Sequence, residues 1–408
     1  MKTENEIILL NVSGHDRPGL TSGLTEILAQ YKTNILDIGQ AVIHNELNLG
    51  ILFEVPKESE SSPILKELLF KSYEIGLNIK FTPISGNDYN IWVNEQGKDR
   101  FLITLLGKKI SAEQISKVAS LIYNQKLNID KISRLSGRVN LEQQKNNESN
   151  SVVEFSISGK LPDLDKLKAE FLKISSQLSF DIALQRDNVF RRNRRLFCFD
   201  MDSTLIQTEV IDEIAMYANV GEEVKKITES AMKGEIDFKE SFKKRLMLLK
   251  GIEEKVLQEI ANKLPLTNGA GRLFKTLKKY GYKTAIISGG FTYFGDYLKQ
   301  MLGIDYVYAN RLEIKDGKLT GNYIGEIIDG NKKAALLKEL TIKENIHPEQ
   351  VIAVGDGSND LPMLRLAGLG IAFHAKPIVK ENAKQAISTI GLDAILYLIG
   401  FKDREIEP

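Results

Sequence analysis

The sequence predicts an α/β protein in which a doubly wound parallel sheet with a small helical cap follows two ferredoxin-like domains of βαββαβ order. Three short segments in the C-terminal half, at 196–199, 283–287 and 351–354, are largely apolar and are each followed by small or polar residues. Such runs are typical of buried parallel strands, whose carboxyl ends meet at one ligand-binding edge of a sheet. The N-terminal half shows one order of strand and helix patterns twice.

The first copy is predicted to form a domain over residues 1–86. Its apolar residues alternate in the segments expected to be strands and recur at helical spacing in the segments expected to be helices. The expected strands are 7–12, 34–43, 47–55 and 78–84, and the expected helices are 20–31 and 64–75. This order predicts a ferredoxin-like fold.

The second copy is predicted to form a domain over residues 98–186. The segment from Asn128 to Ile132 repeats the pattern of Asn34 to Ile38, at a period of about 94 residues. The expected strands are 101–106, 128–132 and 152–158, and the expected helices are 112–125 and 164–178. The repeat therefore predicts a tandem pair of ferredoxin-like domains.

The third domain is predicted to span residues 187–408. Helical patterns fill residues 206–265, between the first two apolar strands, so we expect a small helical cap there. Five arginines gather between Arg186 and Arg195. We interpret this stretch as a solvated linker at the domain boundary rather than as a nucleic-acid patch, because the whole chain is nearly neutral.

Composition excludes several classes of function. The net charge is +1, and no apolar run is long enough to span a membrane. We therefore expect a cytoplasmic protein without a nucleic-acid or membrane partner. A single cysteine, Cys198, rules out an internal disulfide, and its position in an apolar strand predicts a core side chain.

The polar residues at the three strand ends are the candidate site. Asp200 and Asp202 are two apart in an extended segment, so both carboxylates can face one crevice. Ser288 and Gly289 end the second strand, and Lys333 opens a helical pattern. The third strand ends in the segment 355–360, with Asp356, Asn359 and Asp360. Paired carboxylates suggest nucleophilic or acid–base work beside a divalent cation.

These segments together resemble the four motifs of the haloacid dehalogenase (HAD) superfamily, and the intervening sequence is similar to the phosphoserine phosphatase family. The resemblance implies an aspartyl-phosphate on Asp200, with Asp202 as general acid and base, although the sequence alone would allow these roles to be exchanged. It also implies Mg²⁺ as the cofactor, bound by Asp200, Asp202 through its carbonyl, and Asp356, with Thr204 and Asp360 supporting the ligands. Ser288, Gly289, Lys333 and Asn359 would hold the phosphate.

Substrate choice is expected to lie in the cap. Glu209 and Arg245 match the positions that would hold the ammonium and carboxylate groups of O-phospho-L-serine. Met232 and Phe238 would wall the pocket. The implied reaction is hydrolysis of that ester to L-serine, the last step of L-serine synthesis.

The first ferredoxin-like domain resembles an ACT domain, a module that senses amino acids. His15, Asp16, Pro18 and Gly19 lie in the loop that would bind an effector such as L-serine, next to a helix N-terminus that favours a carboxylate. The second copy has Gly107-Lys108-Lys109 instead, so we expect a structural or dimerising role there. Paired ACT-like domains imply a homodimer.

Two other functions remain open. One is an HAD phosphotransferase, or a phosphatase for another small phosphometabolite. The other, from a different class, is an amino-acid sensor whose HAD-like domain is a non-catalytic scaffold. The intact motif residues favour an enzyme over the scaffold.

Overall fold

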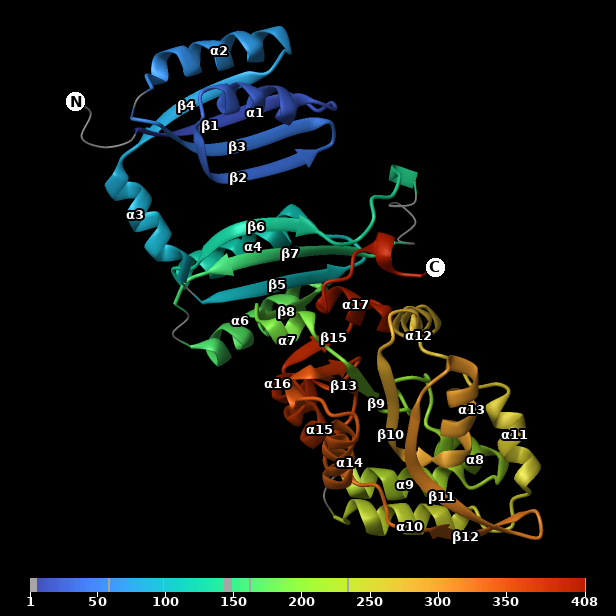
Figure 1. The fold of residues 1–408 in the computed structure, drawn as a ribbon. Coiled ribbons are helices and arrows are strands. Elements are labelled where there is room, and N and C mark those ends of the chain that lie inside the picture. The colour runs from blue at the N-terminus through green and yellow to red at the C-terminus, as the bar shows by residue number, and fades with distance from the viewer. Residues whose placement is uncertain are drawn as a thin grey trace. The chain divides into compact units, whose positions relative to one another are not determined.

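A computed structural model describes residues 6–57, 59–97, 99–142, 149–160, 163–232 and 235–407, except for the side chains of Gln96 and Met232. The chain forms two compact units, Met1–Lys98 and Asp99–Pro408. Figure 1 shows their elements. Each unit is described by itself.

The first unit has the predicted βαββαβ order. Its four strands form an antiparallel sheet of order β2-β3-β1-β4, and α1 and α2 pack on one face around buried side chains such as Leu24, Phe53 and Leu68. The sequence did not predict the last helix, α3. The elements are β1 Glu6–His15, α1 Leu20–Gln30, β2 Asn34–Ile43, β3 Glu46–Val55, α2 Ser61–Glu74, β4 Asn78–Ile84 and α3 Gly86–Asn94.

The second unit begins with a second ferredoxin-like module, with sheet order β6-β7-β5-β8. The repeat extends to irregular detail: β2 shifts register between Ile35 and Asp37, and β6 does so between Ile129 and Lys131, 94 positions later. The elements are β5 Arg100–Gly107, α4 Ala112–Asn124, β6 Asn128–Arg134, β7 Ser151–Ser158, α6 Leu164–Leu178 and β8 Asp181–Arg186.

The rest of the second unit is built on a seven-stranded sheet of order β12-β11-β10-β9-β13-β14-β15. Six of these strands are parallel, and β12 joins the edge through an antiparallel hairpin whose turn is Asp316-Gly317. The short strand β15 was not predicted from the sequence. The strands are β9 Leu196–Phe199, β10 Lys283–Phe291, β11 Tyr306–Lys315, β12 Lys318–Ile324, β13 Val351–Gly355, β14 Leu369–Phe373 and β15 Gln385–Ile387.

Helices cover both faces of this sheet, which explains its continuous apolar strands. Phe197 and Phe199 of β9 face one core, whereas Cys198 faces the other, because neighbouring strand residues point to opposite faces. The first core is closed by α12 Ala270–Lys279, α13 Thr292–Leu302 and α17 Ile395–Leu398. The second is closed by α14 Gly330–Lys343, α15 Leu361–Leu366 and α16 Pro377–Asn382 (Figure 1).

The predicted helical cap is present between β9 and β10. An isolated antiparallel bridge pairs Ile206 with Leu266, so the two chain segments that lead into and out of the cap lie side by side. Phe242 and Leu246 of the cap pack into the same core as Phe291 of the sheet. The cap helices are α8 Val210–Tyr217, α9 Gly221–Met232, α10 Phe238–Leu248 and α11 Glu254–Ala261.

The arginine-rich stretch corrects one prediction. It contains a short helix, α7 Val189–Arg192, and two of its guanidinium groups are buried rather than solvated. Arg191 forms an ion pair with Glu154 of β7, and Arg194 donates to the Glu349 carbonyl. A buried ion pair needs a partner from another part of the fold, so charge counting along the sequence did not anticipate it.

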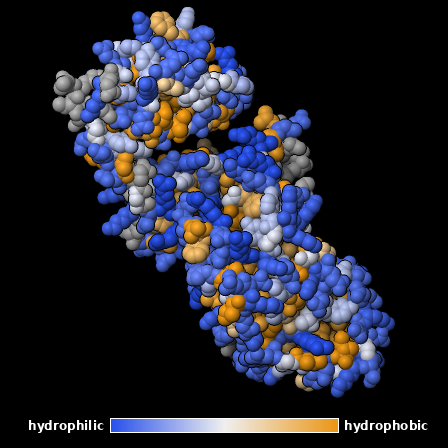
Figure 2. All heavy atoms as spheres, viewed as in Figure 1, coloured by the Kyte–Doolittle hydropathy of each residue, from blue (hydrophilic) through white to orange (hydrophobic). Residues whose placement is uncertain are grey.

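In the part of the chain that the structure describes, no helix has the length and apolar character needed to cross a membrane. Figure 2 shows the apolar residues of one face as separate patches among hydrophilic ones.

Candidate active site

Three neighbouring strands bring the predicted motif residues to one edge of the sheet. β9 lies between β10 and β13, and all three run parallel, so their carboxyl ends coincide. The Asp200 N–H donates to the Val354 carbonyl at 2.8 Å, which extends the pairing by one residue and places the carboxylate at the strand tip. Asp200, Asp202 and Ser288 are all buried there.

Lys333 supplies a buried cation to this edge. Its ammonium nitrogen lies 2.9 Å from Asp200 Oδ1 and 2.7 Å from Asp360 Oδ1. Burial lowers the pKa of Lys333, but the two carboxylates more than offset that effect, so the pKa lies above its ordinary value and the group stays charged. The Asp360 carboxylate also accepts the Gly357 N–H, which fixes the loop after β13. The cation therefore has a fixed position beside Asp200.

Asp356 completes a group of carboxylates that fits a metal ion. Oxygens of Asp200, Asp356 and Asp360 lie within 4.8 Å of one another. Burial, followed by the charges of Asp200 and Asp360, raises the pKa of Asp356 to about 7. Thr204, predicted as a supporting residue, donates to Asp356 at 3.3 Å. Carboxylates crowded in this way suit a hard divalent cation, which offsets their repulsion.

Asp202 lies in a different environment from Asp200. Its Oδ1 accepts the Val210 N–H at 3.2 Å, and burial, together with the charges of Glu209 and Asp200, raises its pKa well above the ordinary value. A carboxyl group with a raised pKa can hold a proton and donate it. Gly290 makes room for it, because a Cβ there would lie 2.5 Å from Asp202 Oδ2.

A cavity of about 680 Å³ opens between this edge and the cap. Most of the predicted site residues line it: Asp200, Asp202, Glu209, Phe238, Arg245, Ser288, Gly289, Asp356 and Asn359. Thr204, Lys333 and Asp360 support the site from behind its lining. The side chain of Met232 lies outside the described residues.

Arg245 of the cap is half-buried and lines the cavity. Burial lowers its pKa, while Asp212, Glu209 and Asp202 act in the opposite direction. Within the described residues, its buried Nε has no hydrogen-bond partner. An unsatisfied guanidinium N–H at the wall of a cavity fits a carboxylate of a bound molecule.

Several lining residues escaped the sequence analysis. Ser241 of α10 has a buried hydroxyl oxygen without a partner among the described residues, and Thr228 and Lys376 also line the cavity. Asn310 lies behind the Ser288 loop, where its amide donates to the Gly289 carbonyl at 2.7 Å and accepts the Ile328 N–H at 2.9 Å. No local sequence signal marks these residues, because their neighbours come from distant segments.

The loop after β1 in the first unit is exposed, as an effector site would require. Gly19 has φ +92°, a left-handed conformation that suits glycine, and α1 begins at the next residue. Arg17 donates to the Ile75 carbonyl at the end of α2, which ties the loop to the module. Ligand binding at His15, Asp16, Pro18 and Gly19 stays a prediction.

Comparison with known families agrees with the description of both the first unit and the module built on the seven-stranded sheet. The model of the ACT domain matches residues 6–82, and the model of the haloacid dehalogenase-like hydrolases matches residues 194–368. The fold and the site therefore define an HAD-like hydrolase that carries an ACT domain.

Relatives over the full length narrow the assignment. A phosphoserine phosphatase from Streptomyces coelicolor is 38% identical over 400 residues, which cover 98% of this chain and 93% of that protein. Another, from Mycobacterium tuberculosis, is 34% identical over 401 residues, which cover 98% and 94%. The chain belongs to the phosphoserine phosphatase family.

Solved structures show the same fold. An HAD-family hydrolase from Salmonella enterica serovar Typhi has a TM-score of 0.63 at 31% identity, covering 73% of this chain and 99% of that one. A probable phosphoserine phosphatase from Vibrio cholerae has a TM-score of 0.57 at 32% identity, covering 75% and 87%.

Proposed function

We propose that the protein hydrolyses O-phospho-L-serine to L-serine and phosphate, through an aspartyl-phosphate on Asp200, as the last step of L-serine synthesis. The observation that supports this proposal most directly is that one cavity is lined by two kinds of chemical group. The sheet edge offers a carboxylate nucleophile beside a buried cation, and the cap offers Arg245 and Glu209. Phosphoserine has matching parts: a phosphate, a carboxylate and an ammonium group.

In the first half-reaction, an Asp200 oxygen attacks phosphorus and the bond from phosphorus to the serine oxygen breaks. The Met201 N–H and the Lys333 ammonium group both contact Oδ1 of Asp200. Among the described contacts, Oδ2 has no such partner, so it is the oxygen that attacks phosphorus. Asp202, whose raised pKa favours the protonated form, gives its proton to the leaving serine oxygen. The Ser288 hydroxyl and the Gly289 N–H hold the phosphoryl oxygens.

In the second half-reaction, Asp202 takes a proton from water while the water oxygen attacks phosphorus. The bond between phosphorus and the Asp200 oxygen then breaks, and phosphate leaves. Cap residues such as Phe238, whose ring lies 3.3 Å from the position of a Cβ on Gly289, keep bulk water from the phosphoryl group. Lys333 neutralises charge at the nucleophile throughout.

Mg²⁺ would be held by Asp200, Asp356 and the main-chain carbonyl of Asp202. When bound, it supplies positive charge that lets a dianionic substrate approach several carboxylates. The crowded carboxylates and the raised pKa of Asp356 support this cofactor.

The deciding experiment is a steady-state assay across phosphorylated metabolites with Mg²⁺. We expect L-phosphoserine to have the highest kcat/KM, and Asp200→Asn to lose at least about a thousandfold in kcat. Similar rates on phosphothreonine or sugar phosphates would reject the substrate assignment. Unchanged turnover by Asp200→Asn would reject the mechanism and favour the scaffold alternative. Phosphoester products formed with added alcohols would favour a phosphotransferase.

We further propose that the first ACT domain binds L-serine and that the chain forms a homodimer. Asp16 at the exposed loop would hold the ammonium, and the N-terminus of α1 the carboxylate. Calorimetric titration of L-serine into the wild type and Asp16→Asn tests the first part, and sedimentation equilibrium tests the second.

A further inference from the structure

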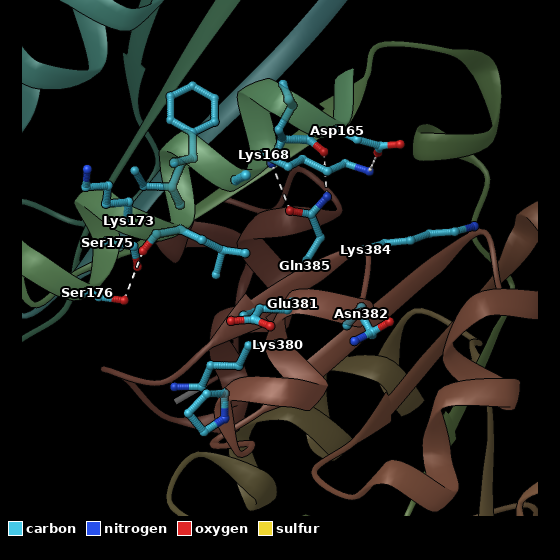
Figure 3. A pocket seen from close by; sticks show the side chains of 18 of the residues that line it. Asp165, Lys168, Lys173, Ser175, Ser176, Lys380, Glu381, Asn382, Lys384 and Gln385 are labelled. Carbon is cyan, nitrogen blue, oxygen red and sulfur yellow. Dashed lines mark hydrogen bonds and ion pairs between the residues drawn. The ribbon is translucent and has the colours of Figure 1, made fainter. Parts of the chain in front are cut away.

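A second cavity, of about 740 Å³, lies within the second unit and away from the catalytic edge. Its walls come from two modules: α6 and β8 of the second ferredoxin-like module, and α15, α16 and β15 of the catalytic module. Figure 3 shows Lys168 and Asp165 of α6 on one side and Lys380, Glu381 and Asn382 of α16 on the other. This volume is in the range of small-molecule sites.

The joint between the modules forms the floor of this cavity. The side-chain amide of Gln385 bonds to both the N–H and the carbonyl of Leu184, so β15 and β8 are held together. Nearby, the buried carboxylate of Asp181 accepts the backbone N–H groups of Ser388 and Thr389, each at 2.8 Å. Hydrogen bonds therefore hold the two modules together at the base of the cavity, between β8 and the segment 385–389.

Positive charge dominates the lining. Five cationic and two acidic residues line it, namely Lys168, Lys173, Arg365, Lys380 and Lys384 against Asp165 and Glu381, although the Lys384 ammonium group already donates to the Ala367 carbonyl at 2.6 Å. Burial, partly offset by Glu349 and reinforced by Arg194 and Lys168, lowers the pKa of Lys384. Asp165 is almost fully exposed and lies 3.5 Å from Lys168, so solvent screens their attraction. The cavity thus favours an anion.

The rest of the lining mixes apolar side chains with four polar ones, from Ser175, Ser176, Asn382 and Gln385. Phe171, Leu172, Ile182 and Leu184 contribute from the ferredoxin-like module, and Ala386 contributes from β15. A site that offers both cationic and apolar side chains suits an organic anion rather than an inorganic one.

Helix α16 contributes to both the cavity at the joint and the catalytic cavity. Pro377, Lys380 and Glu381 line the cavity at the joint, whereas Ile378 and Val379 line the catalytic cavity. A molecule bound in the cavity at the joint therefore contacts α16, the same short helix that lines the catalytic cavity.

We propose that the cavity at the joint is a regulatory site for a small organic anion, with a phosphoryl or carboxylate group held by Lys168 and Lys380 and an apolar part held by Leu172 and Ile182. Binding stabilises α16 and so restricts the wall of the catalytic cavity. The effect on turnover rests on the proposed phosphatase activity, but binding itself does not.

Calorimetric titration of the full chain with phenylphosphonate, and separately with phenylacetate, tests the site. We expect at least one of the two compounds to bind. The double substitution Lys168→Gln/Lys380→Gln should weaken the affinity for that compound by at least about tenfold, since each lysine offers a charge-assisted bond. The tighter ligand distinguishes phosphoryl from carboxylate recognition. Lys166→Gln/Lys338→Gln makes the same change in net charge outside the cavity and should leave binding unchanged.

A steric variant tests the same site without a change of charge. Ala169→Trp, at an exposed position of α6 that lines the cavity, should also abolish binding of the compound. Hydrogen exchange should slow over 377–382 when the ligand binds. The proposal is overturned if neither ligand binds, if the lysine pair and Ala169→Trp leave binding intact, or if exchange in α16 does not change. None of these readouts requires phosphatase activity, so a wrong substrate assignment would remain distinguishable.

Discussion

The ammonium nitrogen of Lys333 lies 2.9 Å from the Asp200 carboxylate, although the lysine side chain is fully buried. Asp360 is its second partner, so the cation sits between two carboxylates. Charge balance in the buried part of the site thus depends on one residue that reaches the sheet edge from α14.

Lys333→Met should therefore damage both activity and stability. Removing one partner from a buried ion pair leaves uncompensated charge, which costs about 3–5 kcal/mol in the free energy of unfolding. Urea denaturation and kcat measure the two effects. Lys332→Met is the matched control, because Lys332 pairs with exposed Glu326 at the surface and should change stability by at most about 1 kcal/mol. Equal effects of the two variants would contradict the assigned role.

Gly290→Ala should lower kcat by about a hundredfold or more, because the new Cβ would lie 2.5 Å from Asp202 Oδ2 and 2.6 Å from the Met201 side chain. Gly271→Ala provides the control. Gly271 is in α12 with no atom near its Cβ position, so alanine there should retain activity and stabilise the protein by about 0.5–1 kcal/mol. A fully active Gly290→Ala enzyme would show that Asp202 can move without loss.

Arg245→Met should raise the KM for phosphoserine by about 10- to 100-fold, since a charge-assisted bond to the substrate carboxylate is lost. Phosphoethanolamine lacks that carboxylate, so its KM should change little. Lys244→Met, on the same helix but paired with Glu240 at the surface, should leave both values unchanged. An equal loss for the two substrates would mean that Arg245 acts on the phosphate or on cap folding.

The stability of the metal-free protein should fall as pH rises through about 7. Burial and neighbouring carboxylates raise the pKa values of Asp356 and Asp360 to about 7, whereas an unfolded aspartate titrates near about 4. Between these values the folded state holds protons that the unfolded state has lost, so stability decreases with pH. Urea denaturation in EDTA measures the slope.

Mg²⁺ should reverse this trend, because it replaces the protons as the balancing charge. Its stabilising effect should be larger at pH 8 than at pH 6, and Asp356→Asn should reduce both the slope in EDTA and the response to Mg²⁺. A flat profile in EDTA would show that the pKa values of Asp356 and Asp360 are not raised in the folded state.

Local sequence order was enough to predict the βαββαβ repeat, the parallel sheet, the cap and the strand ends that carry Asp200, Ser288 and Asp356. Strand periodicity and the polar ends of apolar runs are properties of adjacent residues, so they can be recognised without a partner. The short β15 was missed because three residues are too few to show a period, and α3 was missed because it buries none of its residues and so has no apolar face.

By itself, the sequence determined which side chains lie at the ends of the strands. Because the strands are parallel, their carboxyl ends meet at one edge of the sheet. Only the tertiary structure decided which partners the buried polar side chains have: Lys333 lies between two carboxylates, Arg191 pairs with Glu154, and Asn310 lies behind the Ser288 loop. The cavity at the joint likewise exists only because two modules pack together. Burial and charge balance depend on segments far apart in the chain, and no local pattern records them.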